Sequence, residues 1–242
     1  MKVLLYSGGT DSWLIDKLWK PDIKIYIDVG GRYSKEEIER LPKDVKIVEF
    51  KYLGTLEEPE SAYIPLRNLY FIMIASNYGD EICLGAVKGD QGSKDKTVEF
   101  MGMSESIINY CLDTNYGINK KVHVTKEFIE LSKYELVQMY IDNGGTIKEF
   151  IGNTFSCHHP VEDKECFRCK PCYRKFLLGY YFGFKYTDEQ KRNMINYLKE
   201  NVIPYNKYYG TYFTERRGEG EYAAKAVDRL FKEYGLDWKD YK

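Results

Sequence analysis

Short apolar runs alternate with segments of helical periodicity over the first 150 residues. The runs have the length of buried strands, and the segments between them repeat apolar residues at three and four positions. Strands that alternate with helices predict an α/β fold with a doubly wound, mostly parallel sheet. The expected strands cover residues 2–6, 23–29, 45–50, 81–84 and 121–124, and the expected helices cover 11–20, 34–41, 66–78, 104–112 and 132–143.

Two of these helices carry end signals. Ser34 is followed three residues later by Glu37, which predicts a capping box at the start of the second helix. The fifth helix is followed by Gly144 and Gly145, which predict its end.

The pattern changes after about residue 150. A cysteine-rich segment precedes an apolar helix at 176–184, and two polar helical stretches follow at 188–201 and 219–234. We expect an α/β domain, a metal-binding segment packed on it, and a C-terminal helical extension. Their expected boundaries are 1–150, 151–186 and 187–242.

Composition narrows the choice of function. Hydrophobic residues make up 43% of the 242 residues and charged residues 30%, as in folded soluble proteins. The formal net charge is −1, so a sequence-neutral grip on nucleic acid is not expected. The first apolar run is too short for a signal peptide, and no stretch is long enough to span a bilayer. We therefore expect a cytoplasmic protein with no membrane partner.

A glycine-rich loop lies between the first expected strand and helix, with the sequence Ser7-Gly8-Gly9-Thr10-Asp11-Ser12. Glycines allow the backbone to approach a phosphate, and the helix N-terminus offers amides and a positive dipole end to an anion. The loop lacks the lysine of the G-x-x-x-x-G-K-[ST] pattern and does not match G-x-G-x-x-G. We interpret it as a phosphate-binding loop in which Asp11 holds the loop or helps to bind magnesium. The alternative is a plain structural turn.

Asp28 ends the second expected strand. Ligands of open α/β sheets bind outside the carboxyl ends of the strands, which would let Asp28 face an adenosine. The alternative is an ordinary aspartate at the end of a strand.

Four of the six cysteines lie within sixteen residues, in the pattern C-x8-C-x2-C-x2-C. Clustered cysteines in a reducing compartment more often bind metal than form disulfides. Four thiolates close a tetrahedron around zinc and leave no position for water, so the site is expected to be structural. An iron–sulfur cluster and a disulfide pair are the alternatives. The ligands are Cys157, Cys166, Cys169 and Cys172, whereas Cys83 and Cys111 are expected to be small buried side chains.

The loop and the cysteine pattern, in this order, resemble the 7-cyano-7-deazaguanine synthase family of the ATP-pyrophosphatase superfamily. The family loop S-G-G-x-D-S matches Ser7 to Ser12, and the family segment V-P-x-R-N is similar to residues 64–68. The lead-in T-W-S-C resembles residues 154–157, and a helix start that bears a lysine resembles residues 130–133. The resemblance covers residues 1–180, approximately.

The resemblance implies an ATP-dependent ligase with an adenine-nucleotide hydrolase-like fold. Such enzymes convert 7-carboxy-7-deazaguanine and ammonia to 7-cyano-7-deazaguanine through an acyl adenylate, with release of AMP and pyrophosphate. ATP, zinc and magnesium are the implied cofactors, and a homodimer is the implied assembly. The implied catalytic residues are Asp11, Ser12, Arg67 and Lys133, and the implied nucleotide-binding residues are Tyr6, Ser7, Gly8, Gly9, Thr10, Asp11, Ser12, Asp28, Arg67, Asn68 and Gly85. For Arg67 and Lys133, surface salt bridges are the alternative.

The chain departs from the family pattern in three places. Residues 85–95 stand where the family has a G-A-x-x-S-G-Y-P-D-C-R-like segment of the base pocket, and they lack its cysteine–arginine pair. Phe167 replaces a glycine after the second ligand cysteine, and Lys175 replaces an arginine after the last. These departures leave open an amide product or a different carboxylate acceptor. The alternative functions are a tRNA-modifying ATP pyrophosphatase, against which the near-neutral charge counts, and a nucleotide-binding module in a defence complex.

Overall fold

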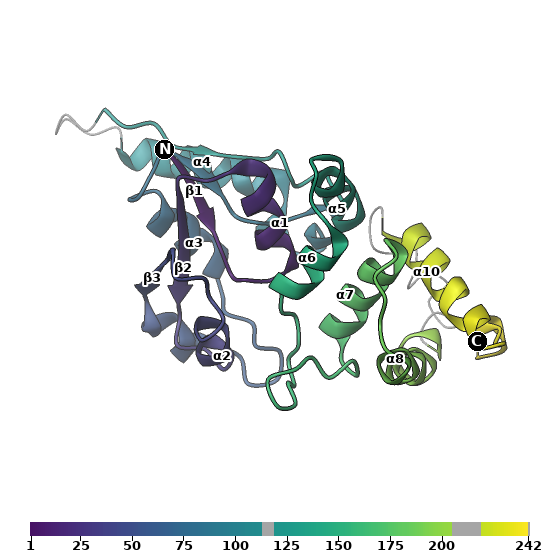
Figure 1. Ribbon diagram of the computed structural model, residues 1–242. Coiled ribbons are helices and arrows are strands. Elements are labelled where there is room, and N and C mark those ends of the chain that lie inside the picture. Colours follow the sequence, from purple (N-terminus) through teal and green to yellow (C-terminus); the bar gives the residue numbers. More distant parts are fainter. Residues whose placement is uncertain (113–118, 205–218, 242) are drawn as a thin grey trace. The chain divides into compact units, whose positions relative to one another are not determined.

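The computed structural model of the protein describes residues 1–112, 119–204 and 219–241. The chain forms two compact units, Met1–Leu131 and Ser132–Lys242, which we describe one at a time (Figure 1). The boundaries expected from the sequence at 150 and 186 remain a prediction, because compactness groups residues by packing and not by function. Among the described residues, no helix combines the length and apolarity that crossing a membrane requires.

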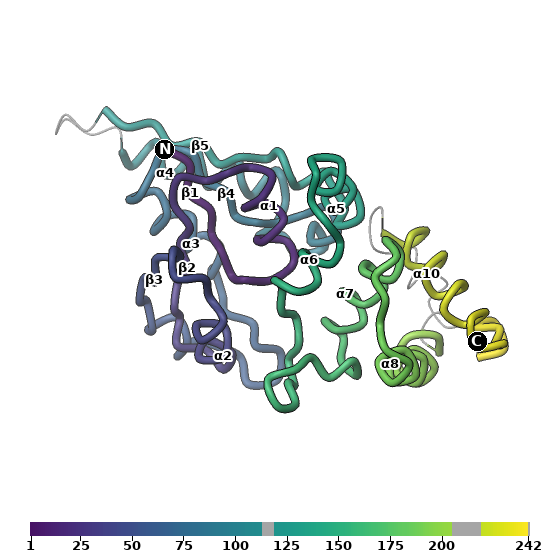
Figure 2. Tube along the Cα trace, viewed as in Figure 1, coloured from purple at the N-terminus to yellow at the C-terminus, as the bar shows by residue number. Residues whose placement is uncertain are grey.

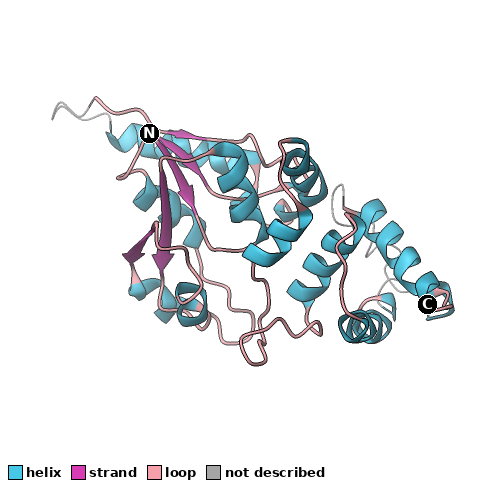
Figure 3. Cartoon of the chain, viewed as in Figure 1, coloured by secondary structure: helices cyan, strands magenta, loops and turns pink. Residues whose placement is uncertain are grey.

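The first unit is built on a parallel five-stranded sheet in the order β3-β2-β1-β4-β5 (Figure 3). The central strand β1 pairs with β2 on one side, where Val3 lies opposite Ile23, and with β4 on the other, where Val3 lies opposite Ile82. This confirms the expected doubly wound α/β fold. The strands are β1 (Lys2–Leu5), β2 (Ile23–Asp28), β3 (Val45–Glu49), β4 (Glu81–Cys83) and β5 (His123–Val124).

Helices cover both faces of this sheet. Val3, Leu5 and Ile25 lie in one core cluster with Ile72 of α3 and Met101 of α4, so these two helices pack on the same face. The main helices are α1 (Thr10–Trp19), α2 (Ser34–Ile38), α3 (Arg67–Ala75) and α4 (Val98–Leu112), with 3-10 turns η1 (Lys51–Leu56), η2 (Lys88–Asp90) and η3 (Lys94–Lys96) between them. Figure 2 follows the chain through them.

The capping box expected at Ser34 is wrong. Tyr33 is the N-cap residue of α2, and the Ser34 hydroxyl instead accepts a hydrogen bond from the Gly31 amide at 3.1 Å. The Glu37 carboxylate accepts a hydrogen bond from the Tyr26 hydroxyl at 2.7 Å. Tyr26 alternates with Ile25 along β2, so α2 lies on the face opposite α3 and α4.

The second unit is helical. Its helices are α5 (Lys133–Asp142), α6 (Ile147–Asn153), α7 (Lys170–Tyr181), α8 (Asp188–Asn201) and α10 (Gly220–Glu233), with a final 3-10 turn η4 (Trp238–Tyr241). Capping is strong here: Ser132 and Glu135 form a capping box on α5, and Thr187 and Gln190 form one on α8.

One apolar core joins the cysteine segment to the C-terminal helices. Cys172 and Phe176 of α7 are buried together with Leu198 of α8 and Phe231 of α10. The C-terminal helices are therefore not a loose appendage, because they complete the core on which the cysteines rest.

Candidate functional site

The glycine-rich loop occupies the point where the strand order of the sheet reverses. The chain runs outward from β1 to β2 and β3 on one side and to β4 and β5 on the other. Adjacent crossovers then leave in opposite directions from the carboxyl ends of β1 and β4, and the resulting crevice is the usual ligand site of such sheets. The loop follows β1 directly, and Gly85 follows β4.

The loop backbone has the geometry that glycine permits. Gly8 has a φ of +75°, a left-handed conformation that other residues adopt at a cost. Gly9 is the N-cap of α1 and cannot supply a side-chain oxygen to its first turn. Since helix N-termini attract anions, this turn is suited to bind a phosphate.

Two serines close the loop. The Ser12 hydroxyl accepts a hydrogen bond from the Ser7 amide at 3.3 Å and donates to the Gly9 carbonyl at 3.3 Å. Ser12 is 4% exposed, whereas Ser7 is exposed. The buried Ser12 hydroxyl therefore holds the loop backbone in shape, whereas the Ser7 side chain is accessible to a ligand.

The remaining loop residues differ in accessibility. Asp11 is half-buried and accepts a hydrogen bond from the Thr10 hydroxyl at 3.3 Å. The Tyr6 side chain is buried, and burial, together with the charges of Asp16 and Asp44, raises its pKa to about 12. Tyr6 is thus presented to the loop through its backbone, with its ring packed inside.

Asp28 is used within the protein. It is 6% exposed, its carboxylate accepts a hydrogen bond from the Gly30 amide at 2.9 Å, and it lies 3.8 Å from the Lys51 ammonium. These contacts fix the turn after β2, so the Asp28 carboxylate has a structural role at the carboxyl end of this strand.

Arg67 and Asn68 begin α3 and point to different partners. The Arg67 guanidinium lies over the Phe71 ring at 5.8 Å and interacts electrostatically with Glu37 and Glu57. The buried amide of Asn68 donates to the Asp95 carboxylate at 2.8 Å. Arg67 is therefore a cation within electrostatic range of two carboxylates, and Asn68 anchors the segment that contains Asp95.

Gly85 opens the segment 85–95 that departs from the family pattern. Its φ is +74°, and a Cβ atom there would lie 3.3 Å from the Leu5 carbonyl oxygen, at the end of β1. Two further bonds hold the segment inside the first unit: the Lys88 amide donates to the Leu131 carbonyl at 2.9 Å, and the Gln91 side chain donates to the Ile129 carbonyl at 2.8 Å. The segment is thus fixed by hydrogen bonds within the first unit, and it begins beside the carboxyl end of β1.

Lys133 belongs to the second unit. It is the first residue of α5, directly after the capping residue Ser132, which is fully buried. Its backbone amide donates to the Glu219 carboxylate at 3.4 Å. The sequence provided no signal for this contact, because the two residues are 86 positions apart.

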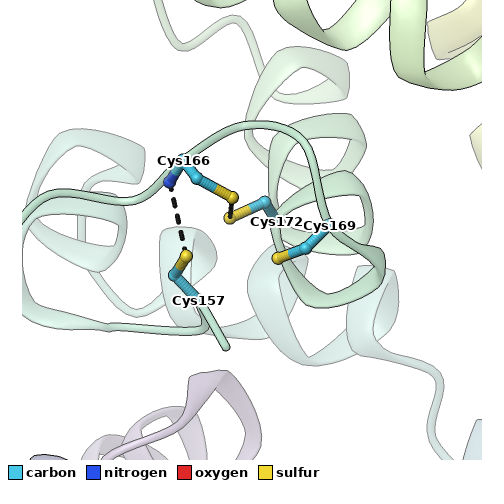
Figure 4. A group of neighbouring side chains, drawn as sticks. All are labelled: Cys157, Cys166, Cys169 and Cys172. Carbon is cyan, nitrogen blue, oxygen red and sulfur yellow. Dashed lines mark hydrogen bonds between the residues drawn. The ribbon is translucent and has the colours of Figure 1, made fainter. Parts of the chain in front are cut away.

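The four cysteines of the expected metal site converge (Figure 4). All four Sγ atoms lie within 4.8 Å of one another, and those of Cys166 and Cys172 are 4.0 Å apart. A single ion bound to four sulfurs at 2.3 Å would set them about 3.8 Å apart. An iron–sulfur cubane gives each thiolate its own iron and spreads the sulfurs farther. The donor set therefore fits one tetrahedral ion.

Local structure prepares these thiols for a metal. Cys169 is the N-cap of α7, and the Cys157 sulfur accepts hydrogen bonds from the His159 and Cys166 amides, both at 3.3 Å. The pKa of Cys169 is lowered to about 4, chiefly because the Cys172 thiol donates a hydrogen bond to it. The same bond raises the pKa of Cys172. The expectation for Cys83 is confirmed, since it is buried, but that for Cys111 is wrong, since it lies on the exposed side of α4.

A buried ion pair supports the cysteine segment. Lys175, 4% exposed, lies 3.0 Å from the Glu165 carboxylate and also donates to the Thr154 carbonyl. Glu165 in turn accepts a hydrogen bond from the Ser156 amide at 2.7 Å. The sequence pattern drew attention to Lys175, three positions after the last ligand cysteine. Its partner, Glu165, could be identified only from the fold.

Comparison with known proteins identifies a family. The family described as queuosine biosynthesis protein QueC matches residues 35–177. Three relatives, each named 7-cyano-7-deazaguanine synthase, are similar in sequence. The relative from Campylobacter jejuni (strain 81116) is 24% identical, and the match covers 71% of this chain and 72% of the relative. The relative from Aquifex aeolicus is 26% identical, over 72% of this chain and 93% of the relative. The relative from Geobacter sp. (strain M21) is 28% identical, over 70% of this chain and 88% of the relative.

A solved structure is also similar over most of the chain. It is the U34-tRNA thiolase NcsA from Methanococcus maripaludis with its [4Fe–4S] cluster, 16% identical, with a TM-score of 0.39 and coverage of 98% of this chain and 74% of that one.

Proposed function

This chain belongs to the QueC family of queuosine biosynthesis proteins, and on that premise we propose that it is an ATP-dependent ligase. It converts 7-carboxy-7-deazaguanine and ammonia to 7-cyano-7-deazaguanine, or stops at the amide, with release of AMP and pyrophosphate. The observation that carries the proposal is the position of the Ser7-to-Ser12 loop, with Gly8 at a φ of +75°, at the switch point of the sheet.

The reaction proceeds in balanced steps. A carboxylate oxygen of the acceptor attacks the α-phosphorus of ATP, and the bond to pyrophosphate breaks. Ammonia attacks the carbonyl carbon of the acyl adenylate, and AMP leaves as the amide forms with loss of a proton. The amide oxygen then attacks the α-phosphorus of a second ATP, which releases a second pyrophosphate and one N–H proton, and elimination of AMP with loss of the other N–H proton leaves the nitrile.

The loop supplies stabilisation where negative charge develops. The first-turn amides of α1 and the exposed Ser7 hydroxyl bind the pyrophosphate as it leaves. Asp11 would help to hold a magnesium ion, which would neutralise phosphate charge. Buried Ser12 keeps the loop in shape, so its contribution is to preorganise the amides.

Two cations complete the proposed chemistry. Arg67 has the planar fork that pairs with a phosphate or carboxylate, and it lies within electrostatic range of Glu37 and Glu57. Lys133, the first residue of α5, is the second proposed cation, and its ammonium is a point charge of the kind that suits a phosphate. Residues 85–95, held by Asn68, form part of the acceptor pocket.

The metal in this proposal is a structural zinc ion. Cys157, Cys166, Cys169 and Cys172 would hold it, because four converging thiolates suit zinc and leave no position for substrate. The ion would fix the segment between Cys157 and Cys166, which is otherwise supported by few apolar contacts.

Mass spectrometry of the reaction products tests the proposal. The purified protein is incubated with ATP, magnesium, ammonium and 7-carboxy-7-deazaguanine, and the same mixture without ammonium serves as control. A nitrile or amide with AMP and pyrophosphate is expected, and both should be lost in Asp11→Ala. Pyrophosphate release without modified acceptor would contradict the assigned substrate, and no ATP cleavage with any carboxylate would contradict the ligase.

A further inference from the structure

The second unit places a buried ammonium beside the four cysteines. Lys175 lies on α7, one turn after the ligand Cys172, and its side chain is 4% exposed. Burial lowers its pKa, whereas the charges of Glu165, Cys172 and Cys157 act in the opposite direction. A buried ammonium is costly unless anions offset its desolvation, and here those anions include two of the expected metal ligands.

The Lys175 ammonium joins three parts of the cysteine segment. It lies 3.0 Å from the carboxylate of Glu165, the residue before Cys166. It also donates to the carbonyl of Thr154, three residues before Cys157. The lysine itself belongs to α7, whose N-cap and first turn supply the other two ligands. One cation therefore ties together the three stretches of chain from which the four sulfurs come.

The Glu165 carboxylate extends this network to the first ligand. The same oxygen that faces Lys175 accepts a hydrogen bond at 2.7 Å from the amide of Ser156, the residue before Cys157. The Cys157 sulfur in turn accepts a hydrogen bond from the Cys166 amide at 3.3 Å, drawn as a dashed line in Figure 4. These contacts set Cys157 and Cys166 beside each other through backbone groups, and they do not depend on the ion.

The metal centre itself would carry negative charge. Four thiolates bring four negative charges and a zinc ion offsets two of them, so the bound centre retains two. Glu165 adds a further negative charge in the same region. Lys175 lies within electrostatic range of two of the sulfurs and of Glu165. Since charges interact strongly where water is excluded, this ammonium should stabilise the loaded centre more than the empty one.

We propose that Lys175 is a positioning residue of the metal centre, which holds the ligand segments in place and balances the negative charge of the bound thiolates. This inference rests on the proposed function, in which the four cysteines hold a zinc ion. It predicts that a change at Lys175 acts on metal affinity and not on folding alone. A residue that only stabilised the fold would weaken the empty and the loaded protein equally.

Four single variants separate charge from shape. Lys175→Met keeps an unbranched side chain but removes the ammonium, so zinc affinity should fall about tenfold to a hundredfold. Lys175→Arg retains the positive charge and should retain most of the affinity. Glu165→Gln keeps an oxygen for the Ser156 amide and leaves the cation to the thiolates, so the affinity should equal or exceed that of the wild type. Lys164→Met is the matched control, because Lys164 adjoins Glu165 but is exposed.

Three measurements on the whole 242-residue chain report on the metal centre. Competition with a chelator of known affinity gives the zinc affinity of each variant. Thermal unfolding with and without zinc shows the linkage, and zinc should raise the melting temperature of Lys175→Met less than that of the wild type. Cobalt(II) in place of zinc reports on the sulfurs. A cation beside a sulfur holds its electrons more tightly, so Lys175→Met should move the sulfur-to-cobalt charge-transfer absorption to longer wavelength, which an effect on folding would not do.

The outcomes distinguish the two proposals. A wild-type protein that binds no zinc would show that the zinc site of the proposed function is wrong, and this inference would fall with it. If the wild type binds zinc but Lys175→Met holds it as tightly, with unshifted cobalt absorption, the role of Lys175 is overturned and the zinc site stands. Equal losses of affinity in Glu165→Gln and Lys175→Met would also overturn it, since the ion pair would then act on the metal only through the fold.

Discussion

The side-chain amide of Asn68 donates to the carboxylate of Asp95 at 2.8 Å, and also to the Asp95 carbonyl at 3.2 Å. Asn68 is 4% exposed, so its amide has no access to bulk water. The two bonds fasten the segment that departs from the family pattern to the helix that begins with Arg67. If residues 85–95 form part of the acceptor pocket, as proposed, Asn68 acts on that pocket through Asp95.

Asp95→Ala should weaken acceptor binding more than ATP binding. Loss of the carboxylate leaves the Asn68 amide with one bond, which costs about 1 kcal/mol of stability, and loosens residues 88–96. We expect a higher KM for the carboxylate acceptor and an unchanged KM for ATP in steady-state assays. Lys94→Ala, an exposed change in the same segment, is the control. Equal increases in both KM values would show that the segment does not form an acceptor-specific pocket.

Thiol labelling should divide the six cysteines into three classes. In the metal-loaded protein, Cys111 should react at once because it is exposed, whereas the four ligand thiolates should be protected. Cys83 should remain unlabelled even at pH 10, because burial raises the pKa of its thiol to about 12. A strong chelator should add the four ligands to the labelled set, and metal analysis should give about one zinc per chain.

Cys169→Ser provides the matching genetic test. It should abolish stoichiometric zinc binding and expose the core that α7, α8 and α10 share, with a lower melting temperature. Cys111→Ser lies outside the cluster and should change neither property. Full zinc content in Cys169→Ser would contradict the four-cysteine site, and iron with absorbance near 400 nm would contradict zinc.

Phe167 should show an unusual order of substitutions. It has a φ of +52°, which favours glycine, but its ring packs edge-on against Phe176 and Tyr186 at 6.3 Å and 5.9 Å. Phe167→Gly loses the packing and relieves the strain, whereas Phe167→Ala loses the packing alone. The alanine variant should therefore be less stable than the glycine variant by about 1 kcal/mol in urea unfolding. The opposite order would indicate that the backbone at this position is unstrained.

Tyr6 should make the protein sensitive to alkali. Its pKa is about 12 when folded and close to 10 when unfolded, so the folded state retains the proton more tightly. The stability that this group contributes is complete below pH 10 and is lost as the pH rises from 10 to 12, by about 2–3 kcal/mol. Tyr6→Phe should remove this part of the loss, as measured by urea unfolding at pH 9 and pH 11.

Two controls accompany the prediction that Tyr6 makes the protein sensitive to alkali. Tyr52→Phe alters a side chain that is 64% exposed and should leave the pH dependence unchanged. At neutral pH, Tyr6→Phe should retain pyrophosphate release, because the Tyr6 ring is buried and only its backbone faces the loop. A large loss of activity would instead assign the hydroxyl to the nucleotide site.

Local sequence was sufficient to predict the sheet and the position of the glycine-rich turn before α1. Five short apolar runs became five parallel strands, and the glycines of the loop stand where the backbone turns into α1. These features depend on neighbours in the sequence, which periodicity and turn residues report directly.

Features that depend on distant residues were not predictable. The S-x-x-E pattern occurs at Ser34 and at Ser132, but only the second forms a capping box, because the buried Tyr26 hydroxyl draws Glu37 away from the first. The helix expected from residue 176 begins at Lys170, since Cys169 acts as its N-cap. The partners of Lys175 and Lys133, Glu165 and Glu219, likewise required the fold.

The strand order has a consequence for synthesis on the ribosome. β1 emerges first and becomes the central strand, and each later strand joins an edge that is already present: β2 and β3 on one side, then β4 and β5 on the other. No pair of strands that has already formed must separate to let a later strand insert between them. The nascent chain can therefore assemble its sheet in the order of translation, and the Ser7–Ser12 loop at the end of β1 gains a second neighbouring strand when β4 pairs with β1.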